Sequence, residues 1–144
     1  DKISANSVAT LIDGLSTNAL QVGDALLAGD PGLAIALLDA LIDAGEPALR
    51  IVATLTGQIR GWLWVLLLEQ QGERDVAVIA KAAGIGNPKR IYVMRKQLQG
   101  QSPQRCLNLL GRLLDVEAAL KRGAQPGNAF RDGLLGSTLL GSTQ

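Results

Sequence analysis

Recurring helix start and stop signals constrain the fold of this chain more than any other feature. At three places a residue that caps helices stands before a proline, which suits the first helical position: Asp30-Pro31, Asn87-Pro88 and Ser102-Pro103. Glu46-Pro47 repeats the pattern with a poorer capping residue. Helices often end at a residue that tolerates positive φ. Six glycines stand at such places: Gly29, Gly45, Gly72, Gly84, Gly100 and Gly123.

Between these signals, apolar residues recur three and four positions apart, as they do on one face of a helix. This spacing is shown by Leu33, Leu37, Leu38 and Leu41, and again by Leu107, Leu110, Leu113, Leu114 and Leu120. No stretch alternates for long enough to predict a strand. The pattern predicts an all-α fold, a compact bundle of about seven helices after a short leading one. The expected helices span residues 4–13, 17–28, 31–44, 47–71, 74–83, 88–99, 103–122 and 128–140.

The predicted helix 47–71 is apolar on nearly every side, which indicates a central place in the bundle. Gly57 and Gly61 lie four residues apart in this helix and would let another backbone come close. The longest apolar run, "WLWVLLL", is far shorter than the roughly 20 residues that span a bilayer. No signal-peptide pattern opens the chain. We therefore expect a soluble, cytoplasmic protein without membrane contact, and Asp1 at the first position indicates a fragment or a processed product.

The composition excludes several kinds of chemistry. The chain has no histidine and one cysteine, so it can form neither an internal disulfide nor a His/Cys metal site. Cys106 lies in an apolar helical pattern with no histidine to activate it, and we expect a small buried side chain rather than a nucleophile. No glycine-rich phosphate loop is present. Asp24, Asp39 and Asp43 fit helix caps and solvated faces. We predict no catalytic residue, no cofactor and no metal.

Charge is distributed unevenly along the chain. Residues 1–78 contain ten acidic and four basic residues, a net charge of −6. Residues 79–144 contain ten basic and three acidic residues, a net charge of +7. Such asymmetry indicates either a partner for the second half, for example nucleic acid, or an attraction between the two halves. The sequence leaves both alternatives open.

Residues 74–99 have the pattern of a helix-turn-helix, with a basic second helix after the glycine turn in "VIAKAAGIGNPKRIYVMRKQLQ". In a DNA-reading motif of this kind, residues near the start of the second helix reach the bases, and Asn87, Lys89 and Arg90 could do so. Against this, Ile91 follows Gly84 by one residue more than we would expect. The flanking helices also do not form a compact three-helix unit. A DNA-binding regulator remains the alternative hypothesis, and a solvated basic face in a larger bundle is the simpler one.

The order of motifs resembles the C-terminal part of the delta subunit of bacterial DNA polymerase III, a component of the sliding-clamp loader. The similarity covers about residues 16–140 and lies in the sequence of elements rather than in one motif. These elements are the "ALLAGD" helix end, the Gly45-Glu46-Pro47 turn, the Gln58 and Arg60 pair in a long apolar helix, "IAKAAGIGNPKRIYVMRKQ" and the closing "LLDVEAALKRG".

This resemblance implies a helical collar domain over residues 16–144, with residues 1–15 as the end of a preceding lid-type domain or a linker. It implies a non-catalytic assembly role in DNA replication. The implied partners are the other loader subunits, of the ATPase gamma/tau type and the delta-prime type. The resemblance also implies that the sliding clamp is reached only through an N-terminal domain outside this sequence, and that primer-template DNA is contacted without sequence preference.

Two groups of residues are candidate contact sites. An unpaired charge inside an apolar helix is costly, so we expect Arg60 either to pair with Glu69 or Asp115 or to face a partner subunit. Trp62 and Trp64 lie about 200° apart around a helix, so one is expected in the core and the other at an interface. The expected contacts to DNA phosphates are Lys89, Arg90, Arg95, Lys96, Lys121 and Arg122.

Overall fold

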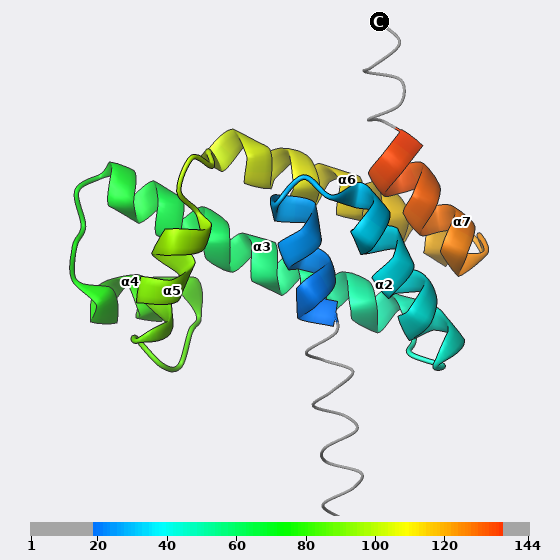
Figure 1. The fold of residues 1–144 in the computed structure, drawn as a ribbon, viewed down its shortest axis with the longest axis horizontal. Coiled ribbons are helices and arrows are strands. Elements are labelled where there is room, and N and C mark those ends of the chain that lie inside the picture. Colours follow the sequence, from blue (N-terminus) through cyan, green and yellow to red (C-terminus); the bar gives the residue numbers. More distant parts are fainter. Residues whose placement is uncertain (1–18, 137–144) are drawn as a thin grey trace, which may run out of the picture. The chain divides into compact units, whose positions relative to one another are not determined.

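The computed structural model describes residues 19–136, and this part of the chain is built of helices without a strand (Figure 1). Residues 19–27 form the first helix. The others are α2 (Pro31–Asp43), α3 (Ala48–Gln70), α4 (Val76–Ala83), α5 (Arg90–Gln97), α6 (Pro103–Lys121), α7 (Pro126–Arg131) and the π-helix η1 (Asp132–Gly136). The all-α prediction is confirmed. The predicted helix 4–13 and the end of the predicted helix 128–140 lie outside the described residues.

The predicted helix ends agree with the structure where a local signal sets them. All six glycines named from the sequence adopt positive φ, between 74° and 94°. Asp30 accepts a hydrogen bond from the Leu33 backbone N–H at 3.1 Å, and Ser102 accepts one from that of Arg105 at 3.3 Å. Four starts differ from the prediction. Asp75 caps α4, which therefore begins at residue 76 rather than 74, and Gln125 caps α7, which begins at 126 rather than 128. The helix α3 begins at 48 rather than 47, and α5 begins at 90 rather than 88, without the side-chain cap expected from Asn87.

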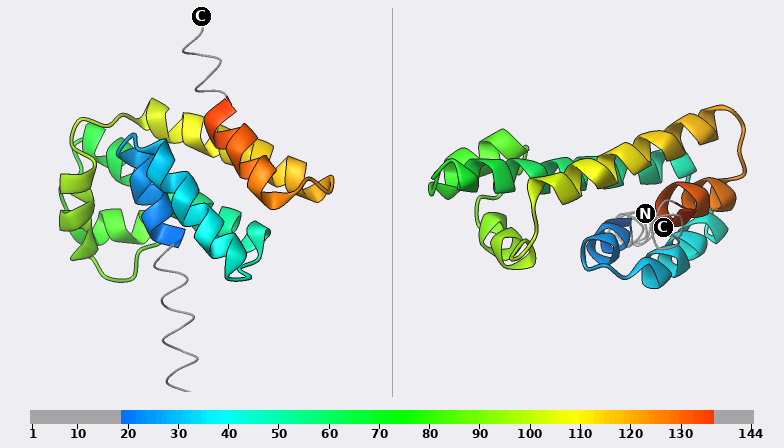
Figure 2. Two further views of the ribbon diagram at one scale, coloured as in Figure 1. Left: turned by 45° about the vertical axis from the view of Figure 1, so that its right-hand side comes forward. Right: turned by 90° about the horizontal axis from the view of Figure 1, so that it is seen from above.

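The chain divides into two compact units. Of the described residues, unit 1 comprises 19–55 and 112–136, and unit 2 comprises 56–111. In unit 1, α2 lies beside α7 (Figure 2), and Arg131 on α7 forms an ion pair with Asp39 on α2 at 2.6 Å. The buried apolar residues of this unit include Val22, Leu38, Leu41, Ile51, Leu55, Leu113, Val116, Phe130 and Leu134.

In unit 2, α4 packs against α5. The buried side chains include Ile59, Trp62, Val65, Ile79, Ile91, Met94, Leu98, Cys106 and Leu109. A Cβ atom placed on Gly61 would lie 4.0 Å from the Ala83 carbonyl oxygen and 3.8 Å from Met94 Cε. A backbone therefore lies beside Gly61, but at an ordinary van der Waals distance that would also admit a Cβ atom. No atom lies within 4 Å of the Cβ position of Gly57.

The helix α3 is long and apolar enough, by length and composition alone, to cross a membrane. The sequence expectation rested on its short uninterrupted apolar run and did not anticipate this. Much of the helix nevertheless lies in the protein core, as Ile51, Leu55 and Ile59 show. An exposed stripe also runs along the helix. The stripe consists of Ala53, Gly57, Arg60 and Trp64.

Candidate functional site

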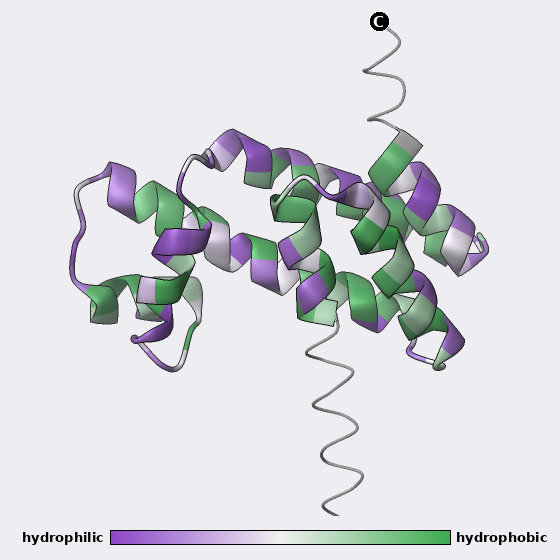
Figure 3. Ribbon diagram, viewed as in Figure 1, coloured by the Kyte–Doolittle hydropathy of each residue, from purple (hydrophilic) through white to green (hydrophobic). Residues whose placement is uncertain are grey.

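The basic helix α5 has one buried face and one exposed face. Ile91, Met94 and Leu98 point into the core of unit 2, as the helical spacing predicted. Lys89, which directly precedes the helix, is exposed, and so are Arg90 and Lys96. In Figure 3, α5 accordingly carries both hydrophilic and hydrophobic residues. The neighbouring helix α4 is mostly hydrophobic.

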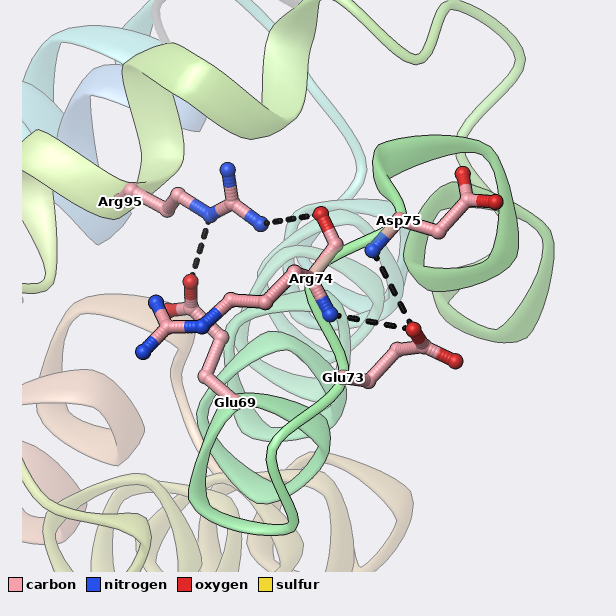
Figure 4. Close-up of polar contacts among 5 residues, drawn as sticks. All are labelled: Glu69, Glu73, Arg74, Asp75 and Arg95. Atoms are coloured by element: carbon pink, nitrogen blue, oxygen red, sulfur yellow. Dashed lines mark hydrogen bonds and ion pairs between the residues drawn. The ribbon is translucent and has the colours of Figure 1, made fainter.

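Arg95 differs from the other basic residues of this segment. Its Nε donates to Glu69 Oε2 at 2.5 Å, and its Nη2 donates to the Arg74 carbonyl oxygen at 3.2 Å (Figure 4). Only 24% of the Arg95 side chain is exposed, and its guanidinium lies 5.8 Å from the centre of the Tyr92 ring. The prediction that Arg95 belongs to a free basic face is therefore wrong, because this side chain ties α5 to the end of α3.

The loop between α3 and α4 is ordered by hydrogen bonds from backbone N–H groups to carboxylates. Glu73 Oε2 accepts hydrogen bonds from the backbone N–H groups of Arg74, at 3.0 Å, and Asp75, at 3.2 Å (Figure 4). Asp75 in turn accepts from the Ala77 N–H at 2.9 Å and caps α4. The Arg74 carbonyl is thus presented to Arg95 by an ordered loop. Sequence reasoning missed the Arg95 contacts, which join segments 21 and 26 residues apart, and it also missed the local cap at Asp75.

The two tryptophans occupy opposite environments, as their spacing predicted. Trp62 is 2% exposed and Trp64 is 44% exposed. Arg60 lies four residues before Trp64 on the exposed stripe of α3. It forms no ion pair with a carboxylate of the described residues, and Glu69 pairs with Arg95 instead. The expected pairing of Arg60 with Glu69 or Asp115 is therefore wrong, and a partner-facing position remains the prediction for this residue.

A glycine turn follows α4, but the connection to α5 is longer than the three or four residues of a usual helix-turn-helix. Gly84 ends α4 in the left-handed conformation, with φ of 74°, and the backbone N–H of Lys89 donates to Asn87 Oδ1 at 3.1 Å. Six residues, 84–89, separate the two helices. The geometry holds Lys89 and Arg90 at the exposed start of α5, while Arg95 is withdrawn from it.

Comparison with known proteins identifies the family of this chain. The family model for the DNA polymerase III delta subunit, C-terminal domain, matches residues 16–132. The chain belongs to this family. Delta subunits of this family are components of the DNA polymerase III clamp loader. No curated protein matches the chain, and no solved structure matches it.

The two remaining basic candidates of this delta-family domain lie in unit 1, not in unit 2. Lys121 Nζ lies 3.5 Å from Glu117 Oε1 on the same helix. Arg122 lines a pocket of about 280 Å³ together with Asp115, Asn128 and Asp132. Both cations therefore have carboxylates in their surroundings. Their assignment to DNA phosphates stays a prediction, as it does for Lys89, Arg90 and Lys96.

Cys106 is fully buried in unit 2, which confirms its expected place as a small core side chain. Burial raises the pKa of the Cys106 thiol, and the nearby Arg105 charge only partly opposes this shift. A raised thiol pKa disfavours the thiolate, which is the reactive form. Within residues 19–136, no group of three or more potential ligands is arranged to hold a metal ion.

Proposed function

We propose that this chain is a non-catalytic assembly module of the clamp loader, which joins the other loader subunits during DNA replication. The family match over residues 16–132 carries this proposal. Large apolar side chains are exposed on α2 to α6, and singly such side chains are normal at a protein surface. They are Leu33, Leu49, Trp64, Val78, Tyr92, Val93, Leu107 and Leu114.

The exposed stripe of α3 is the proposed subunit contact in unit 2. Tryptophan and arginine dominate the binding energy of many interfaces, and here Arg60 and Trp64 lie one helical turn apart on the same exposed side. Gly57, one turn earlier, adds no side chain that would hold a partner away. Trp62 takes no part in this contact because it is buried in its own unit.

The proposed partners are the ATPase subunits of the gamma/tau type and the delta-prime type, in the cytoplasm. The test is co-purification of the tagged chain with these subunits. We expect the wild-type chain to retain an ATPase subunit and Trp64→Ala to retain at least about tenfold less, the size of a hot-spot effect. Trp64→Ala must unfold at the same temperature as the wild type for the loss to count. If the wild-type chain retains no loader subunit, the proposal is wrong.

A DNA-binding regulator remains the second candidate, because the Gly84 turn and the exposed Lys89 and Arg90 fit such a motif. This function requires base discrimination of about 1–3 kcal/mol per base pair. The ion pair of Arg95 counts against the regulator, since this side chain is one of the four cations expected on the second helix of the motif and is not free to contact DNA.

A further inference from the structure

Unit 2 contains most of a long stretch of the chain that has no acidic residue. Between Asp75 and Asp115 there are seven basic residues and no aspartate or glutamate. Arg95 pairs with Glu69 from outside this stretch. Lys81, Lys89, Arg90 and Lys96 are exposed and form no ion pair within the described part of the chain. Three of these four cations, Lys89, Arg90 and Lys96, lie on α5 or directly before it, and uncompensated positive charge on one helix attracts an acidic partner.

Two of these cations flank an apolar pair on α5. Lys89, Tyr92, Val93 and Lys96 follow the spacing i, i+3, i+4 and i+7, which places them on one side of a helix. We call these four residues the α5 outer face. Lys89 has helical backbone angles although it precedes the helix, so the geometry extends to it. Tyr92 is 55% exposed and Val93 is 67% exposed, which makes them the two most exposed large apolar side chains of unit 2.

The α5 outer face is presented on a fixed helix. On the opposite side Ile91, Met94 and Leu98 are buried. At the flank Arg95 is held by Glu69 and by the Arg74 carbonyl (Figure 4). A surface that is already ordered loses little conformational freedom when a partner binds, which favours affinity.

We propose that the α5 outer face docks an acidic protein surface that carries an exposed apolar side chain. Val93 decides the class of the partner. Phosphates would engage Lys89 and Lys96 but would gain nothing from an isopropyl group between them. An apolar side chain bordered by carboxylates satisfies all four residues, because it covers Tyr92 and Val93 while the carboxylates meet the two lysines.

This inference rests on the proposed function in one respect, since it takes the partner to be another subunit of the loader. It adds a contact on a different helix from the exposed stripe of α3. It also specifies what that partner must present, which the family match does not.

The test uses the full-length natural subunit and measures its affinity for the other loader subunits of the same organism. Two variants alter the α5 outer face, Val93→Ser and Lys89→Glu. Two matched controls make the same changes on the neighbouring helix α4, where Val78 is 46% exposed and Lys81 is exposed: Val78→Ser and Lys81→Glu. All four variants should unfold at the wild-type temperature. If Val93→Ser unfolds at a lower temperature, Val93→Thr takes its place, because threonine keeps the shape of valine and has a hydroxyl in place of one methyl group.

We expect each face variant to weaken binding at least about tenfold and each control less than about threefold. Added salt should weaken wild-type binding, and Lys89→Glu should reduce this salt dependence. If the wild type binds the loader subunits and the face variants bind equally well, the inference is wrong while the proposed function stands. If the wild type does not bind them, both are wrong. If the face variants lose affinity only for a single-stranded or duplex oligonucleotide, the occupant is nucleic acid and the inference is wrong.

Discussion

At the scale of single residues, Gly133 shows how closely η1 packs in unit 1. A Cβ atom at this position would collide with Cγ2 of Val116, and it would also lie 3.5 Å from the Arg112 carbonyl oxygen. Val116 is fully buried, and a β-branched side chain has little rotamer freedom with which to move aside. Sequence reasoning placed Gly133 in the expected helix 128–140 but did not predict this requirement, because the contact with Val116 depends on how two helices pack.

We expect Gly133→Ala to lower the free energy of unfolding by about 1–3 kcal/mol, since overpacking a filled site forces neighbours to shift. Gly57→Ala is the matched control. Gly57 is an exposed helical residue with no neighbour within 4 Å, so alanine there should raise stability by about 0.5–1 kcal/mol. Urea denaturation measures both changes. Equal effects from the two substitutions would contradict the packing described for Gly133.

Cys106 provides a second test at this scale. Because burial raises its thiol pKa, the folded chain holds the thiol proton more tightly than the unfolded chain. The resulting stability is present below the thiol's ordinary pKa and is lost as the pH rises through the raised value. We expect alkylation by iodoacetamide at pH 8 to be at least about tenfold slower in the folded chain than in denaturant. Equal rates in the two states would mean that Cys106 is accessible.

At the scale of helices, the sequence predicted existence and ends better than environment. Caps and terminal glycines are local signals, so the ends at Asp30, Ser102 and the six glycines could be predicted. The environment of a helix depends on which distant segments cover it. The exposed side of α3 and the anchoring of Arg95 by Glu69, 26 residues away, therefore could not be predicted. The burial of Trp62 and exposure of Trp64 could be, because helix geometry alone separates them.

The anchoring of α5 by Arg95 has a measurable energy. We expect Arg95→Met to lower the free energy of unfolding by about 1.5–3 kcal/mol, because it removes hydrogen bonds in which the guanidinium charge takes part and leaves Glu69 without its partner. Lys96→Met changes the neighbouring exposed cation, which forms no ion pair in the described part of the chain, and should stay within about 0.5 kcal/mol of the wild type. Similar losses for both variants would contradict the anchoring role.

The exposed cations of α5 also limit what the helix can do with DNA. With Arg95 withdrawn, three cations remain: Lys89, Arg90 and Lys96. We expect α5 to contribute only weak, sequence-independent binding, with a slope of log affinity against log salt of about −3 at most, since each neutralised duplex phosphate contributes about −0.9. The triple variant with glutamine at these positions gives the contribution of α5 by difference. A selected duplex bound more than about a hundredfold tighter than random ones would restore the regulator hypothesis.

At the scale of the whole molecule, the resemblance in the order of weak motifs correctly predicted the family, whose model matches residues 16–132. The division into two units was not predicted, since α3 and α6 each contribute residues to both units and no linker marks the boundary. The boundaries expected for the domains, 1–15 and 16–144, stay predictions. The charge asymmetry of the sequence corresponds in part to the two units. Unit 2 has eight basic and three acidic residues, whereas the described residues of unit 1 include five basic and eight acidic ones.

The central claim is that this chain joins the other subunits of the clamp loader rather than reading DNA. Sedimentation velocity of the fluorescently labelled chain tests it most directly, with the loader ATPase subunit in one cell and a panel of duplexes, selected and random, in the others. We predict that at micromolar concentration the chain moves with the ATPase subunit in a faster boundary, and that all duplexes bind it weakly and alike. A chain that sediments alone beside the ATPase subunit but moves with one selected duplex would contradict the account.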